Sequence, residues 1–168
     1  MKNTKITTLC LGLAIMGSTL AFTSCKKDKK DPEPEEPTPV VLTNTQKISN
    51  KNFKLTAATI DPGVPTGGTT ITDWYAQMDD CEKDDLINFS ENGTYKDDEG
   101  ATKCATSDPQ TTTGTWVWNT NETIITVTTG TDVTSFDVLV NDGTTLKVKL
   151  TEKIGNTNYA LTETFVKQ

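Results

Sequence analysis

From Asn52 to the end of the chain, apolar residues recur at every second position in short runs. A two-residue period is typical of strands that bury one face and expose the other. The expected inward sets are Phe53, Leu55 and Ala57; Trp116 and Trp118; Ile125 and Val127; Phe136, Val138 and Val140; Leu146, Val148 and Leu150; and Tyr159, Leu161 and Phe165. Connections rich in Asn, Asp, Gly and Thr lie between runs, at 119–121, 130–132, 141–143 and 155–157. Connections this short favour antiparallel neighbours.

The predicted fold is therefore all-β, an antiparallel up-and-down barrel of about eight strands, because closure removes the edges that an open sheet would expose. A β-sandwich of immunoglobulin type is the alternative, and the regular short connections make it less favourable. No amphipathic helix is expected, apart from one short helical turn at residues 73–78.

The N-terminus has the pattern of a bacterial lipoprotein signal. Lys2 and Lys5 precede an apolar stretch at 6–22, which ends in small residues before Cys25. The stretch is too short and too often interrupted by polar residues and glycine for a membrane span. We expect Cys25 to carry the lipid after cleavage, so that the protein is anchored by acyl chains. An ordinary secretory signal with a chance cysteine is the alternative.

Residues 26–39 alternate charges and prolines and contain no apolar residue, which predicts a solvated tether. The expected organisation is a signal peptide at 1–24, the lipidated Cys25 with its tether at 25–45, and a barrel domain at 46–168. The signal around Cys25 resembles those of Bacteroidetes lipoproteins, and this resemblance implies an outer-membrane lipoprotein of the cell envelope, on the periplasmic or the external face. The membrane would be its partner through the lipid.

The charge and composition of the domain exclude several functions. Residues 46–168 contain 10 lysines and 18 acidic residues, which argues against nucleic acid as a partner. The chain has no His and no Arg, so histidine-dependent hydrolysis and histidine metal sites are ruled out. No phosphate-binding loop or nucleophile elbow is present. We expect a monomeric, non-enzymatic protein without a cofactor, and place a hydrolase third among the functions.

Cys10 is expected to leave with the signal peptide and Cys25 to carry the lipid. Cys81 and Cys104 therefore remain for a disulfide. Between them, residues 86–96 predict two strands joined at Asn92-Gly93. The two cysteines are equally distant from this turn and can meet at the open end of the hairpin. A redox or metal-binding pair is the alternative, but the Cys-x-x-Cys spacing is missing.

Acidic residues flank both cysteines, at 79–85 and 97–99. We interpret them as a solvated rim, because runs of charge are usually exposed. A Ca²⁺ site is the alternative, since hard oxygen ligands suit that ion, although the order of residues does not fit an EF-hand.

Several motifs together resemble the lipocalin-like domain lipoproteins of Bacteroidetes. They are Asp73-Trp74-Tyr75-Ala76, Asp80 to Asp85, Phe89, Asn92-Gly93-Thr94-Tyr95, Gly100 to Cys104 and Gly114-Thr115-Trp116. The resemblance covers about residues 50–168. Members usually begin the first strand with Gly-x-Trp, where this chain has Lys51-Asn52-Phe53.

The resemblance implies a barrel that either holds one small apolar ligand or is filled by its own side chains. Aromatic residues are the candidate ligand contacts: Phe89, Tyr95, Trp116, Trp118 and Phe136 inside the barrel, and Trp74 and Tyr75 across its mouth. The first hypothesis is an anchored protein that binds a small hydrophobic or amphipathic ligand. The second is a filled barrel whose surface, including residues 74 and 75, engages proteins or glycans.

Overall fold

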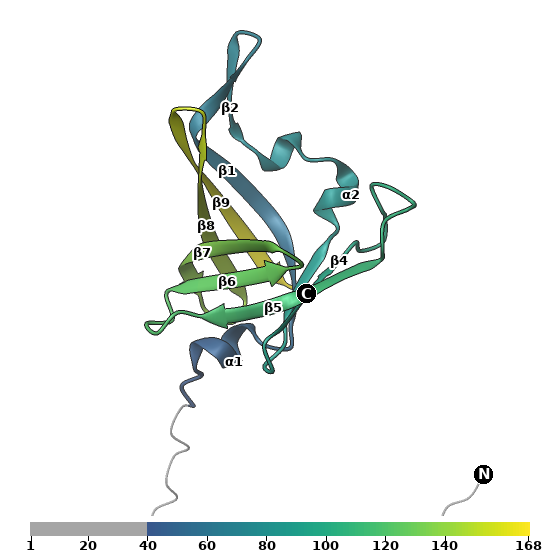
Figure 1. Cartoon of the computed structure of the whole chain (residues 1–168), viewed down its shortest axis with the longest axis vertical. Helices are drawn as coiled ribbons and strands as arrows, with labels where there is room; N and C mark the ends of the chain where they lie inside the picture. The colour runs from purple at the N-terminus through teal and green to yellow at the C-terminus, as the bar shows by residue number, and fades with distance from the viewer. Residues whose placement is uncertain (1–39) are drawn as a thin grey trace, which may run out of the picture. The chain divides into compact units, whose positions relative to one another are not determined.

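The computed structural model describes residues 40–168 (Figure 1). The predicted signal peptide, Cys25 and most of the predicted tether lie outside the described residues. Among residues 40–168, no helix has the length and apolar character needed to span a bilayer.

Nine antiparallel strands form one sheet in the described part of the chain. They are β1 (Asn52–Thr66), β2 (Thr69–Asp73), β3 (Leu86–Phe89), β4 (Thr94–Asp98), β5 (Thr111–Trp118), β6 (Ile124–Thr129), β7 (Asp132–Asn141), β8 (Thr145–Ile154) and β9 (Thr157–Lys167). β1 also pairs with β9, so every strand except β2 belongs to a closed barrel in chain order. The predicted all-β, up-and-down barrel is confirmed.

β1 and β2 form a hairpin that projects beyond the barrel (Figure 1). Gly67 and Gly68 turn the chain there, both with the positive φ that glycine tolerates best. The alternation along β1 was predicted wrongly at Ala57. A bulge between Leu55 and Ala57 shifts the register, so Ala58 is buried and Ala57 is exposed.

A second bulge, in β7, makes the predicted inward position of Val140 wrong. Phe136 and Val138 pack against the core as expected, but the pairing with β8 shifts between Val138 and Val140. Val140 therefore turns outward, with 38% of its surface exposed. Both errors have the same cause, since one inserted residue reverses the face of every side chain that follows it.

A short helix, α1 (Asn44–Ile48), closes one end of the barrel. Thr43 caps it, because its hydroxyl accepts a hydrogen bond from the Gln46 amide while the Gln46 side chain accepts one from the Thr43 amide. Ile48 is fully buried in the barrel core. This helix was not predicted from the sequence, and it crosses the expected boundary between tether and domain at 45/46.

The core lies against α1 and is dominated by aromatic contacts. Trp116 is only 4% exposed, and its ring meets those of Phe89 and Trp118 edge to face, at centroid distances of 5.3 Å and 6.1 Å. Its indole Nε1 donates to the Ser90 carbonyl at 2.9 Å. Within residues 40–168, the buried hydrophobic side chains lie between Ile48 and Val148.

Candidate functional site

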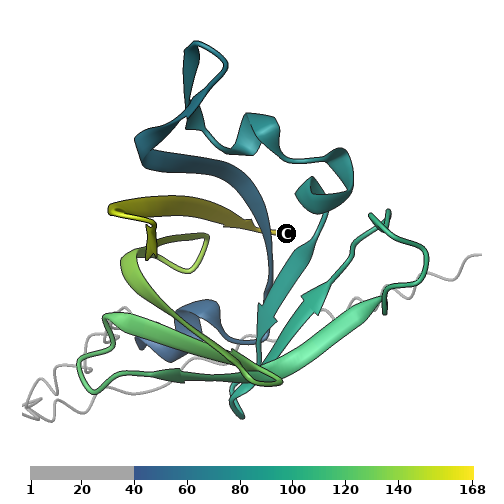
Figure 2. The same ribbon diagram turned by 45° about the horizontal axis from the view of Figure 1, so that its top comes forward.

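A cavity of about 270 Å³ lies inside the barrel, next to this core. Its walls come from the inward faces of seven strands and from the segment between β2 and β3. The lining residues are Leu55, Met78, Glu82, Asp85, Ile87, Phe89, Tyr95, Asp97, Ile125, Val127, Phe136, Leu146, Val148, Glu163 and Phe165. α1 lies at one end of the barrel, and the segment with α2 (Asp80–Lys83) lies toward the other (Figures 1 and 2).

Three of the predicted ligand contacts meet in this cavity. Phe89, Tyr95 and Phe136 all line it, and the rings of Phe89 and Tyr95 are 5.6 Å apart. Trp116 and Trp118 do not line it; they pack against one another in the core beneath. A ligand-binding role for any of the five stays a prediction.

Trp74 and Tyr75 lie apart from the cavity, in separate surface hollows. Trp74 is 37% exposed and borders an apolar hollow of about 310 Å³ with side chains of β1, β8 and β9. Tyr75 begins the short 3-10 helix η1 (Tyr75–Gln77) and borders a groove along β1. The Lys83 ammonium lies 5.6 Å from the centre of its ring.

Acidic side chains form part of the cavity wall, and they were not predicted there from the sequence. Asp97 pairs with Ile87 across β3 and β4, and both side chains point inward. Asp85 lies two residues before Ile87 and faces the same way. Glu163 pairs with Val148 and Ala58, two buried residues, which sets it on the inner face of β9. Glu82 completes the group.

The interpretation of residues 79–85 and 97–99 as a solvated rim is therefore wrong for Asp85 and Asp97. The Oδ1 atom of Asp85 is buried without a hydrogen-bond partner among the described residues, and Asp97 is half-buried. The two-residue period could have predicted these inward positions. Asp85 continues the inward set of Ile87 and Phe89, and Asp97 continues that of Tyr95.

Burial and like charge both disfavour ionisation of these groups. Burial, together with the carboxylates of Asp97, Glu99, Asp84 and Glu82, raises the pKa of Asp85 to about 7. The pKa of Asp97 is raised by burial and by its acidic neighbours, and that of Glu163 by burial alone. Burial and nearby carboxylates also raise the pKa of the Tyr95 phenol.

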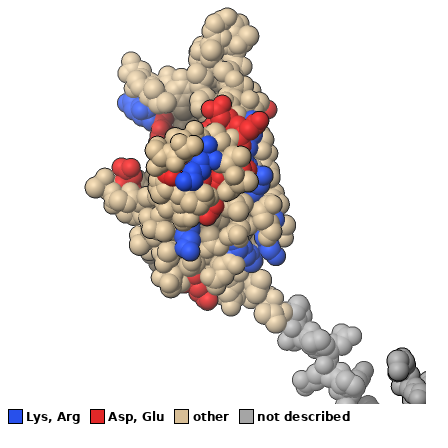
Figure 3. All heavy atoms as spheres, turned by 90° about the vertical axis from the view of Figure 1, so that its right-hand side faces the viewer, with Lys and Arg blue, Asp and Glu red and all other residues tan. Residues whose placement is uncertain are grey.

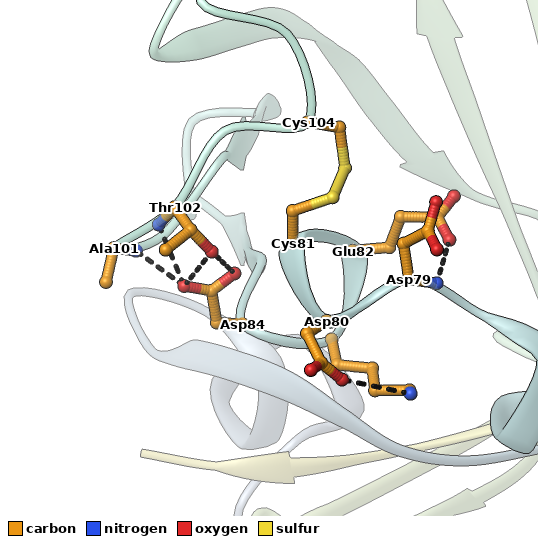
Figure 4. The surroundings of a disulfide bond; sticks show 9 residues. Asp79, Asp80, Cys81, Glu82, Asp84, Ala101, Thr102 and Cys104 are labelled. Carbon is orange, nitrogen blue, oxygen red and sulfur yellow. Dashed lines mark hydrogen bonds and ion pairs between the residues drawn. A yellow bond between two sulfur atoms is a disulfide. The ribbon is translucent and has the colours of Figure 1, made fainter.

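Several acidic residues near Cys81 have structural partners (Figure 4). The Asp84 carboxylate accepts hydrogen bonds from the amides of Ala101 and Thr102, both at 2.9 Å, and from the Thr102 hydroxyl. Asp79 and Glu82 form a capping box at the start of α2. Residues 40–168 contain no group of three Cys, Asp or Glu side chains placed to hold a metal ion, so the Ca²⁺ alternative has no ligand set there.

Cys81 and Cys104 form the predicted disulfide, with their Cα atoms 5.2 Å apart. Cys81 lies in α2 and Cys104 in the loop between β4 and β5, beyond the paired ends of the hairpin. The bond joins these two segments covalently (Figure 4). Asp and Glu atoms gather on the upper part of the face that carries both segments (Figure 3).

Comparison with known proteins bears on the fold and the family. Among solved structures, this chain is similar to a complex of bovine odorant-binding protein with a selenium-containing odorant, at 12% identity and a TM-score of 0.41, over 79% of this chain and 78% of that one. A search of curated proteins gave no match. The family profile described as "Lipocalin-like domain" matches residues 50–148, more than half of the chain. The chain therefore belongs to the lipocalin-like domain family.

Proposed function

We propose that this protein binds a small hydrophobic or amphipathic molecule in its barrel, without catalysis. The cavity of about 270 Å³ among inward-facing side chains carries this proposal. Small-molecule sites are typically concave, mostly apolar and of roughly 300 Å³ upward, with a few polar groups that orient the ligand. A cavity that the barrel's own side chains leave open favours ligand binding over the filled barrel with only surface partners.

Closing the cavity should weaken the binding of a neutral apolar probe. N-phenyl-1-naphthylamine, which is uncharged at neutral pH and fluoresces more strongly in apolar surroundings, suits a fluorescence titration of residues 26–168. We expect Val148→Phe to weaken binding at least about tenfold, since the larger ring enters space that the probe needs.

Val117→Phe is the matched control, because Val117 is 61% exposed on the outer face of β5. Overpacking costs about 1–3 kcal/mol, so circular dichroism must show that both variants remain folded. Equal binding by Val148→Phe and the wild type would place the probe elsewhere and count against the proposed function.

We further propose that the domain is held at the outer membrane as a lipoprotein of the Bacteroidetes kind. The proposal rests on the basic start, the apolar stretch and Cys25, followed by a charged, proline-rich segment. Whether the domain faces the periplasm or the exterior is left to the localisation experiment.

Metabolic labelling tests the anchor. The full chain, expressed in a bacterial host with an alkyne-tagged fatty acid, should become labelled and remain with the membrane fraction. Cys25→Ser should lose the label entirely, because only that thiol is expected to be acylated. Cys10→Ser changes the other N-terminal cysteine and should keep it. Label retained on Cys25→Ser would contradict the assignment. Protease treatment of intact cells then distinguishes the two faces.

A further inference from the structure

The cavity has two chemically different parts. Most of its wall is apolar, with Phe89, Ile125, Phe136, Leu146 and Val148 among the lining side chains. Four carboxyl groups, from Glu82, Asp85, Asp97 and Glu163, make up the acidic part, and no lysine lines the cavity. Any molecule that fills it therefore contacts hydrocarbon and several carboxylates at once.

None of these four carboxylates forms an ion pair with a lysine within residues 40–168. The two ion pairs within residues 40–168 join Lys83 to Asp80 and Lys149 to Asp137, and none of these four lines the cavity. Among residues 40–168, the Oδ1 atom of Asp85 is buried without a hydrogen-bond partner. Buried charges in proteins are normally paired, since an unpaired one is costly.

The three carboxyl groups come from different parts of the barrel. Asp85 precedes β3, Asp97 lies on β4 and Glu163 on β9, and burial together with the carboxylates of all three raises the pKa of the Tyr95 phenol. Glu82, Asp84 and Glu99 add negative charge around Asp85 from α2 and the neighbouring loops. Apart from Tyr95, every titratable group that lines the cavity is acidic.

The missing partner is better supplied by an organic cation than by a metal. No three acidic or cysteine side chains of residues 40–168 are placed to hold a metal ion. The carboxylates also share their cavity with apolar side chains, which a hydrated metal ion would not use. A molecule with a charged head and a hydrocarbon body satisfies both parts of the wall.

We propose that the cavity selects ligands that join an apolar body to a positively charged group, such as a protonated aliphatic amine. This inference rests on the proposed function, because it concerns the same cavity. The charged group would lie among Asp85, Asp97 and Glu163, and the hydrocarbon against the aromatic and aliphatic side chains.

Calorimetric titration with n-octylamine, 1-octanol and octanoate tests the proposal, because the three probes share a similar hydrocarbon chain and differ in charge. At about pH 8 we expect octylamine to bind at least about tenfold more tightly than octanol, because a charge-assisted hydrogen bond is stronger than a neutral one. Octanoate should bind most weakly. At about pH 5 the amine remains charged while Asp85, with its pKa of about 7, is protonated, so the preference for octylamine should shrink.

A neutralised variant identifies the groups responsible. Asp85→Asn/Asp97→Asn/Glu163→Gln should lose the preference for octylamine while still binding octanol. Glu91→Gln/Asp108→Asn/Asp132→Asn removes the same charge from exposed positions outside the cavity and should keep the preference. If octanol binds as tightly as octylamine, the charge inference fails but the cavity proposal stands. If neither these probes nor N-phenyl-1-naphthylamine binds, the proposed function itself fails.

Discussion

Replacing Trp116 with alanine should lower the free energy of unfolding by about 3–5 kcal/mol, the usual cost of removing a buried aromatic side chain. The ring packs edge to face against Phe89 and Trp118, and its indole nitrogen donates to the Ser90 carbonyl. All three contacts are lost together. Because small domains are stable by only about 5–15 kcal/mol, the variant should unfold at clearly lower urea concentration by circular dichroism.

Val117→Ala is the control on the same strand. The Val117 side chain points outward, so its truncation should lower the free energy of unfolding by less than about 1 kcal/mol. If Trp116→Ala does not fold, Trp116→Phe should give a smaller, measurable loss in the free energy of unfolding. A stable Trp116→Ala protein that no longer binds the neutral probe would contradict the core assignment. It would instead support the ligand contact predicted from the sequence.

Removing the disulfide should cost about 3 kcal/mol on the chain-entropy account, given the separation of 23 residues between its cysteines. Urea unfolding of Cys81→Ala/Cys104→Ala against the oxidised wild type measures this loss. The bond joins α2 to the loop before β5, so the variant should also lose order around Glu82 in the cavity wall.

The reduced wild type is the matched comparison. It should unfold at the same urea concentration as the double variant, and a thiol reductant should leave the double variant unchanged. Equal stability of the oxidised and reduced wild type would show that packing alone holds α2 in place.

Much of the barrel was predictable because local chemistry determines it. The inward alternation along β6 and β8 and the short Asn- and Gly-containing turns act over neighbouring residues, so the sequence displays them directly. The bulges in β1 and β7 were not predictable in this way, because they depend on the register of partner strands distant in the chain. α1 was not predicted because one turn of helix is too short to show a hydrophobic periodicity. Its capping residues and Ile48 define it.

The candidate site was predicted only in part, for a related reason. Aromatic residues were predicted as ligand contacts. Trp116 and Trp118 pack in the core, which a domain of this size needs for its stability. Acidic residues were assigned to solvent because runs of charge are usually exposed, although Asp85 just before β3 and Asp97 on β4 lie on the inner face. Glu163 could be connected with them only after β9 was known to close the barrel against β1.

The position of α1 bears on how an anchored barrel would exchange its ligand. The chain enters the domain at the end that α1 and the packed core close, and the C-terminal Gln168 lies there too, its amide bonded to the Asn52 carbonyl. With lipid on Cys25, the closed end would be the one tied to the bilayer through the tether. The acidic end would be free to turn toward the aqueous phase, so cargo would enter and leave through water, and the surrounding ionic strength would govern its capture.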